Sequence, residues 1–194
     1  MNRYAARFSE LAGARRGAFI PFTVLGFPDV ARCAEQLELL AVHADALELG
    51  LPFSDPIADG PTIQRATTVA LQAGVTRAQG LALVAQVRAR HPALPVGLLV
   101  YANPLMHCGL ERFYVEAAAA GVDSVLVADV PSEEGMPFAQ AARRAGVAPV
   151  FIAPPNADAA ALDGKLAQVS FFEQRFERLV RDMANIASRE KGAV

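Results

Sequence analysis

Five short apolar runs recur along the chain, and stretches with helical spacing separate them. The runs occupy residues 18–22, 46–50, 96–101, 124–129 and 149–153. A strand that is apolar along nearly its whole length is typical of a parallel sheet covered on both faces. Strands that alternate with helices favour repeated βα units, which either a closed barrel or an open α/β sheet can accommodate.

The stretches between and after these runs have the periodicity of helices. We expect helices over residues 30–42, 63–73, 77–90, 110–120, 133–145 and 157–169. Three of the helix-to-strand junctions share one plan, in which a turn residue directly follows the helix. Gly121 and Gly146 suit a left-handed helix cap at two of them, and His43 takes that place at the first. The recurrence indicates an internal repeat of βα units.

The number of strands sets the fold class. A closed (β/α)8 barrel typically needs about 250 residues, whereas this chain has 194 and its fifth apolar run ends at residue 153. We therefore expect an α/β fold in which residues 1–170 form an incomplete TIM barrel with about five of the eight strands. Such a sheet would have two unpaired edges and an open apolar interior, so we expect a weakly stable, aggregation-prone or oligomeric chain.

Residues 171–194 differ in character from the rest of the chain. Apolar residues recur there at helical spacing with arginines between them, which predicts a separate amphipathic helical tail. The apolar positions are Phe172, Phe176, Leu179, Val180, Met183 and Ile186. We expect this helix to cover apolar surface. The alternative is a basic helix that binds a membrane or a partner, although the charges of the tail nearly balance.

The overall composition argues against several classes of protein. The 18 basic and 20 acidic residues give a formal net charge of −2, which disfavours an extended nucleic-acid surface. No apolar run reaches the roughly 18 residues of a membrane span, and residues 1–16 lack the apolar core of a secretory signal. Cys33 and Cys108 stand far apart, so a disulfide scaffold or a zinc ribbon fits poorly. We expect a cytoplasmic protein.

Carboxylates gather in and after the second apolar run, within residues 44–66. Glu48 alternates with Leu47 and Leu49, so its side chain should lie on the opposite face of the strand. If that face is a barrel interior, loss of solvation raises the pKa of Glu48 toward neutrality, as a general acid or base needs. Asp59 follows in a loop rich in proline and glycine, and it could form a carboxylate pair with Glu48.

Plainer roles for these carboxylates stay open at this point. Glu48 could be a polar residue at the mouth of the sheet that water solvates, and Asp55 and Asp59 could cap turns. A metal site is the weaker interpretation, because no histidine lies near the three carboxylates.

Other strand residues could form a binding pocket. Asn103, Asp129 and Asn156 each follow a predicted strand, and such residues converge at one end of a parallel sheet. Strand residues of mixed size could line an apolar pocket for a flat aromatic ligand, although core packing explains any single one of them. They are Phe22, Leu99, Tyr101, Leu126, Ala128 and Ile152.

The segment ALELGLPFSDPIADGPTIQ resembles the signature of the tryptophan synthase alpha subunit family. Four further segments resemble that family in the same order: RGAFIPFTVLGFPD, GLLVYANP, GVDSVLVADVP and APVFIAPPNAD. The resemblance covers residues 1 to about 170, and an ordered set of five motifs is highly specific.

The resemblance implies a (β/α)8 barrel that cleaves indole-3-glycerol phosphate to indole and glyceraldehyde 3-phosphate by a retro-aldol reaction, without a cofactor. Glu48 matches the family's catalytic glutamate, which protonates C3 of the indole and moves a proton from the glycerol hydroxyl. Asp59 matches the aspartate that stabilises charge on the indole nitrogen. The six candidate pocket residues match the family's indole pocket.

The resemblance also implies a partner. In the family, indole passes to a beta subunit that holds pyridoxal phosphate, within an alpha2-beta2 tetramer. The loops at residues 53–60 and 103–109 match the surface that contacts this subunit.

The last part of the sequence departs from the family pattern. The family has three more strands, a mobile loop after the sixth and glycine-rich phosphate-binding turns after the seventh and eighth, and these segments have no counterpart here. We expect impaired turnover, because phosphate contacts position the reacting end of the substrate. The alternatives are a non-catalytic product of a truncated or rearranged gene, and a module that only binds the beta subunit. An unrelated barrel enzyme acting on a sugar phosphate fits the signature less well.

Overall fold

The computed structural model describes residues 3–131 and 134–152 of the chain, and within them five parallel strands form one sheet. The strands lie in sequence order, and each pairs with the next. They are β1 Phe22–Val24, β2 Leu47–Gly50, β3 Val96–Val100, β4 Ser124–Val127 and β5 Ala148–Val150. Parallel strands in this order form the wall of a (β/α)8 barrel, so the predicted α/β fold with five barrel strands is confirmed.

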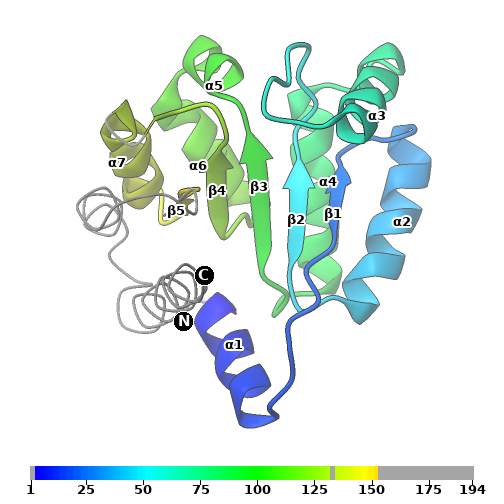
Figure 1. Cartoon of the computed structure of the whole chain (residues 1–194), viewed down its shortest axis with the longest axis vertical. Coiled ribbons are helices and arrows are strands. Elements are labelled where there is room, and N and C mark those ends of the chain that lie inside the picture. The colour runs from blue at the N-terminus through cyan, green and yellow to red at the C-terminus, as the bar shows by residue number, and fades with distance from the viewer. Residues whose placement is uncertain (1–2, 132–133, 153–194) are drawn as a thin grey trace, which may run out of the picture.

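Helices surround this sheet on one face and at both ends (Figure 1). In the described part of the chain they are α1 Arg3–Gly13, α2 Val30–His43, α3 Pro61–Gln72, α4 Arg77–Arg90, α5 Ala102–Cys108, α6 Leu110–Ala120 and α7 Met136–Arg144. Helices α2, α4, α6 and α7 pack in succession along one face. Helices α3 and α5 lie at the carboxyl ends of the strands, which we call the upper end, and α1 lies at the lower end.

Local sequence signals fix the ends of these helices. The Asp29 side chain caps α2 by accepting a hydrogen bond from the Arg32 amide, and Thr76 and Gln79 form a capping box at the start of α4. Gly121 ends α6 in the left-handed conformation, at φ 90°. Helices α4 and α6 therefore have the bounds that the sequence predicts.

Three local predictions were wrong. His43 is still helical, and the residue that caps α2 is Ala44 at φ −79°, so no left-handed residue ends this helix. The sequence analysis also missed α1 and placed residues 103–109 in a loop, whereas α5 occupies most of that segment.

The first strand begins only at the last residue of the predicted range of 18–22. Phe19 is 50% exposed, and Pro21 has no amide hydrogen to donate to a neighbouring strand. The carbonyl of Pro21 still accepts a hydrogen bond from the Glu48 amide at 3.1 Å. Residues 19–21 therefore approach β2 as an extended lead-in, and the ladder itself starts at Phe22.

The two faces of the sheet have different environments. Leu49, Leu98 and Val125 are in register across three strands, and they are buried in the core that the helices complete. Glu48 lies on the other face, in register with Phe22 and Gly97. We call this the inner face, because it corresponds to the interior of a closed barrel.

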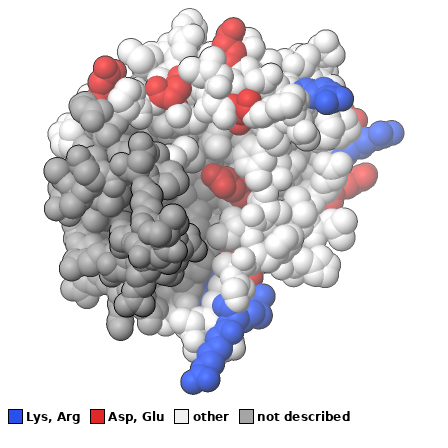
Figure 2. Space-filling view, in the orientation of Figure 1, with Lys and Arg blue, Asp and Glu red and all other residues white. Residues whose placement is uncertain are grey.

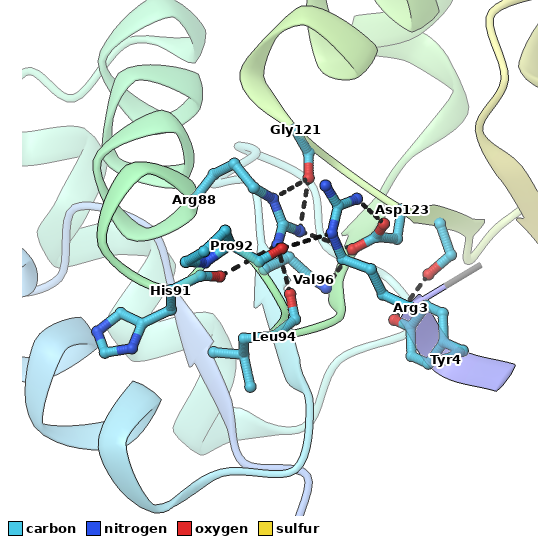
Figure 3. Close-up of polar contacts among 10 residues, drawn as sticks. Arg3, Tyr4, Arg88, His91, Pro92, Leu94, Val96, Gly121 and Asp123 are labelled. Atoms are coloured by element: carbon cyan, nitrogen blue, oxygen red, sulfur yellow. Dashed lines mark hydrogen bonds and ion pairs between the residues drawn. The ribbon is translucent and has the colours of Figure 1, made fainter. Parts of the chain in front are cut away.

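A charged network holds the lower end of the sheet together (Figure 3). The guanidinium of Arg88, on α4, donates hydrogen bonds to the carbonyl of Gly121 at 2.8 Å and to the Asp123 carboxylate at 2.7 Å. Asp123 also accepts a hydrogen bond from the Val96 amide at 2.9 Å. The ion pair is well shielded from water, since the two side chains are 13% and 11% exposed.

Helix α1 docks onto this network. Arg3 donates to the Asp123 carboxylate at 2.7 Å, and the hydroxyl groups of Tyr4 and Ser124 lie 3.0 Å apart in a hydrogen bond. Burial raises the pKa of Tyr4 to about 12, although the bond to Ser124 opposes that shift. The N-terminal helix thus covers the lower end of the inner face.

Several sequence predictions fall outside the described residues. They are the helix over residues 157–169, the amphipathic tail over residues 171–194 and the position of Asn156. Within residues 3–131 and 134–152, no helix is long and apolar enough to cross a membrane.

Candidate functional site

Glu48 is a half-buried carboxylate on the inner face of the sheet. It belongs to β2, and the alternation of that strand buries Leu47 and Leu49 on the helix-covered side. Among the described residues, none donates a hydrogen bond to its carboxylate. Burial raises the pKa of the Glu48 carboxyl above its ordinary value. The sequence prediction for the face and the environment of Glu48 therefore agrees with the structure.

Two glycines let neighbouring side chains pack closely against the sheet beside Glu48. A Cβ atom at Gly97 would lie 2.8 Å from the Ser124 hydroxyl oxygen and 2.9 Å from that of Tyr4. A Cβ atom at Gly50 would lie 2.8 Å from the ring of Phe22. Figure 2 shows that this side of the molecule is hollowed and that acidic side chains lie in the hollow and along its upper rim. The inner face thus offers a recess with a carboxylate in it.

Asp59 lies in the loop that connects β2 to α3 at the upper end. The next residue, Gly60, caps α3, and Pro61 occupies the first turn of that helix. The Asp59 amide donates to the Pro56 carbonyl at 3.0 Å, and its own carbonyl accepts from the Gln64 side chain at 2.8 Å. The backbone of Asp59 is therefore fixed on both sides.

Tyr101 joins this loop to the end of β3. Its hydroxyl accepts a hydrogen bond from the Ala58 amide at 3.2 Å, and its ring lies 5.4 Å from that of Phe53, measured between centroids. Burial raises the pKa of Tyr101 to about 12, and the nearby Asp59 carboxylate contributes in the same direction.

The six candidate pocket residues fall into two groups. Tyr101 is only 2% exposed, because it lies beneath the loop. The other five are partly or well exposed, and strand pairing places Leu99 beside Leu126 and Phe22 beside Glu48. The exposed group is Phe22, Leu99, Leu126, Ala128 and Ile152. Apolar side chains therefore border Glu48, and their role in substrate binding stays a prediction.

The structure adds a groove that the sequence analysis did not anticipate. It lies between β1 and α3 and has a volume of about 460 Å³. Its lining includes Phe22, Phe27, Ile63, Val69 and Arg65. The helical pattern over residues 63–73 hinted at an apolar face on α3, but only the fold shows that this face meets β1.

Other polar residues of the sequence analysis have local partners. Asp129 accepts a hydrogen bond from the Ala102 amide at 2.8 Å and thereby holds the start of α5. Asn103 is exposed on that helix, and Asp55 is exposed and bonded to Ser54. The described residues contain no group of three or more side chains that could hold a metal ion.

Comparison with known sequences gives a consistent result. The family model for the tryptophan synthase alpha chain matches residues 8–173. The tryptophan synthase alpha chain of Escherichia coli O81 (strain ED1a) is 50% identical over 181 residues, which are 93% of this chain and 66% of that protein. The alpha chain of Shigella dysenteriae serotype 1 (strain Sd197) is 49% identical over the same share of both. The chain thus spans about 66% of the length of the curated relatives it matches.

Solved structures show the same similarity. Tryptophan synthase subunit alpha from Legionella pneumophila str. Paris superimposes with a TM-score of 0.83 at 31% identity, over 88% of this chain and 65% of that one. A chain of the tryptophan synthase complex from Pyrococcus furiosus superimposes with a TM-score of 0.74 at 38% identity, over 79% and 63%.

Proposed function

Because the chain belongs to the tryptophan synthase alpha chain family, we propose that its inner face carries out the retro-aldol cleavage of indole-3-glycerol phosphate. In this reaction the bond between indole C3 and the adjacent glycerol carbon breaks. The hydroxyl on that carbon loses its proton and becomes the aldehyde of glyceraldehyde 3-phosphate, while C3 gains a proton and leaves as indole. One proton is removed and one is added, so the reaction needs no cofactor.

Glu48 is the group that we propose to move these protons. The observation that carries this assignment is its position: a half-buried carboxyl with a raised pKa, facing the inner recess without a hydrogen-bond donor among the described residues. Because its pKa is raised, this carboxyl keeps its proton to a higher pH than an exposed glutamate, and such a group can donate to indole C3 and accept from the hydroxyl. An ion-paired carboxylate would hold its charge too firmly for that role.

Asp59 and the apolar residues would serve the indole ring. The Asp59 carboxylate would stabilise the positive charge that develops on the indole nitrogen when C3 is protonated. The flat ring would lie against the side chains that border the recess. We assign this pocket to Phe22, Leu99, Tyr101, Leu126, Ala128 and Ile152.

A beta subunit is the proposed partner. The solved Pyrococcus furiosus relative is a tryptophan synthase α2β2 complex. In this chain the loop before α3 and helix α5 present large apolar side chains to solvent, with Ile57 79% exposed and Met106 65% exposed. Exposed apolar residues on these two segments favour a protein contact at the upper end. Indole released there would pass to that subunit.

The test is release of indole from indole-3-glycerol phosphate by the purified 194-residue chain, with and without a beta subunit. Glu48→Gln should lower turnover by about 10²- to 10⁴-fold, the usual contribution of a general acid–base. Glu35→Gln, on the exposed face of α2, is the matched control and should leave turnover unchanged.

Each result of this assay separates the alternatives. Undiminished turnover in Glu48→Gln would overturn the assignment of Glu48. Activation of a beta subunit by a chain without turnover would indicate a module that only binds that subunit. The absolute rate, set beside that of a full-length relative, measures the predicted impairment.

A further inference from the structure

Tyr101 differs from the other candidate pocket residues in how its polar atom is used. Its hydroxyl oxygen accepts a hydrogen bond from the Ala58 amide at 3.2 Å, and the carboxylate of the next residue, Asp59, lies near enough to act on the same hydroxyl. The side chain is 2% exposed. A buried hydroxyl that bonds to a loop amide in this way holds the loop in place.

The backbone position of Tyr101 is itself fixed by neighbouring parts of the structure. Tyr101 directly follows the end of β3, and its ring packs against Phe53 at the start of the same loop. The next residue, Ala102, donates its amide hydrogen to Asp129 at the end of β4. Two neighbouring strands therefore fix the position from which the hydroxyl reaches the loop.

The loop needs such an anchor because its own contacts are sparse. Between β2 and α3, Ser54, Asp55 and Ala58 are exposed, and Ile57 is 79% exposed. Its internal backbone bonds are short-range ones, such as the bond from the Ile57 amide to the Asp55 carbonyl. A carboxylate on an exposed loop would otherwise sample many positions.

We propose that Tyr101 is a positioning residue whose hydroxyl fixes the loop between β2 and α3 and directs the Asp59 carboxylate toward the inner recess. The assignment rests on the proposed function for its catalytic consequence, because Asp59 acts on substrate only there. The positioning itself is a property of the folded chain, and a measurement without substrate can detect it.

Amide hydrogen exchange, followed residue by residue by NMR, tests the positioning directly. Tyr101→Phe keeps the ring and removes only the hydroxyl, so exchange at the Ala58 amide should accelerate by about tenfold or more when its acceptor is lost. The Asp123 amide, bonded to the Val96 carbonyl at the lower end, should be unchanged. Tyr114→Phe is the matched control, since Tyr114 is equally buried but lies on α6.

Indole release tests the consequence for catalysis. Tyr101→Phe should lower kcat by about tenfold with a smaller change in KM, because a misdirected group costs transition-state stabilisation more than binding. In an Asp59→Ala background the same change should have no further effect on kcat, since the group to be positioned is gone.

The two measurements distinguish the possible failures. Unchanged exchange at Ala58 in Tyr101→Phe would overturn the positioning role, whatever the activity. Faster exchange together with an additive loss of kcat in the double variant would also overturn it, because Tyr101 would then act independently of Asp59. Faster exchange in a chain whose unmodified form releases no indole would support the positioning role and count against the proposed function instead.

Discussion

At the lower end of the sheet Asp123 has fixed charged partners, whereas Glu48 on the inner face and Asp59 in the loop before α3 form no ion pair within the described residues. Asp123 is bonded to Arg88, Arg3 and the Val96 amide. Glu48 has no donor among the described residues, and Asp59 is held through its neighbours and one tyrosine hydroxyl. Both ends belong to the same five strands, so the difference does not come from the sheet itself.

With the proposed function, this contrast separates the groups that stabilise the fold from those that would carry out the reaction. A buried carboxylate with strong donors keeps its charge and holds elements together, but it cannot exchange a proton near neutral pH. A carboxyl that loses solvation without gaining donors is costly to ionise, and it can therefore act as an acid or a base. Barrel folds place their sites at the carboxyl ends of the strands and their stabilising contacts at the other end.

The largest expected loss of stability comes from removing the Asp123 carboxylate at the lower end of the sheet. Asp123→Ala should lower the free energy of unfolding by about 3 kcal/mol, because it leaves the shielded guanidinium of Arg88 without its carboxylate and the Val96 amide without an acceptor. Urea unfolding monitored by circular dichroism measures the change. Asp123→Asn keeps one acceptor oxygen, so its free energy of unfolding should fall by less than that of Asp123→Ala. Equal stability of Asp123→Ala and the unmodified chain would remove the contrast between the two ends.

The second-largest expected loss of stability is that of Gly97→Ala, at the boundary between the two ends of the sheet. Gly97→Ala would place a methyl group 2.8 Å from the Ser124 hydroxyl oxygen and 2.9 Å from that of Tyr4. Overpacking of this kind costs about 1–3 kcal/mol, and here it would also disturb the bond that docks α1. Thermal unfolding measures the loss of stability. A fully stable Gly97→Ala variant would show that α1 docks without the Tyr4–Ser124 contact.

Glu48→Gln is expected to change stability by a smaller amount and in the opposite direction, as a gain. The pKa of Glu48 is raised in the folded chain, so the native state binds its proton more tightly than the unfolded state does. The contribution of Glu48 to stability is therefore greatest below its unfolded pKa and is lost as pH rises through the folded pKa. Glutamine cannot ionise, and the variant should be slightly more stable than the unmodified chain at pH 8.

The pH dependence provides the control for that prediction. Below the unfolded pKa, at about pH 4, Glu48 is protonated in both states and the difference between the two proteins should shrink. Melting temperatures measured from pH 4 to pH 8 give the comparison. A variant that is less stable at pH 8 would mean that the Glu48 carboxylate has a stabilising partner.

The smallest effect sharpens the contrast by showing what an exposed ion pair contributes. Arg112 and Glu116 form a pair four residues apart on the surface of α6, with the arginine side chain 72% exposed. Arg112→Ala should cause no measurable change in urea unfolding, because water screens such a pair. A loss comparable to that of Asp123→Ala would mean that shielding from water does not set the value of an ion pair in this protein.

The sequence predicted the features that depend on local periodicity. The ranges 77–90 and 110–120 appear as helices with those bounds, and four of the five strands fall within or close to the predicted runs. The alternation of β2 correctly predicted the face of the sheet on which the Glu48 side chain lies. The prediction of a loop at residues 103–109 was wrong. Helix α5 is short and contains Pro104 in its first turn, and loops share this pattern.

The bonds that define the two ends could not be predicted in this way. Arg88 and Asp123 are 35 residues apart, Tyr101 and Ala58 are 43 apart, and Arg3 reaches Asp123 across 120 residues. No local pattern relates such pairs, because each partner lies on a different βα unit. For the same reason the sequence did not indicate that Tyr101 lies beneath the loop, and its place in the apolar pocket stays a prediction.

By itself the sequence determined the βα repeat, the family and the strand that carries Glu48, because each depends on residue order and spacing along a short segment. Only the tertiary structure decided which polar groups are satisfied and which are left available. That outcome depends on how strands distant in sequence align side by side. The packing of the strands and helices brings Asp123 to the arginines at one end of the sheet and leaves Glu48 on the inner face without an ion pair in the described part of the chain.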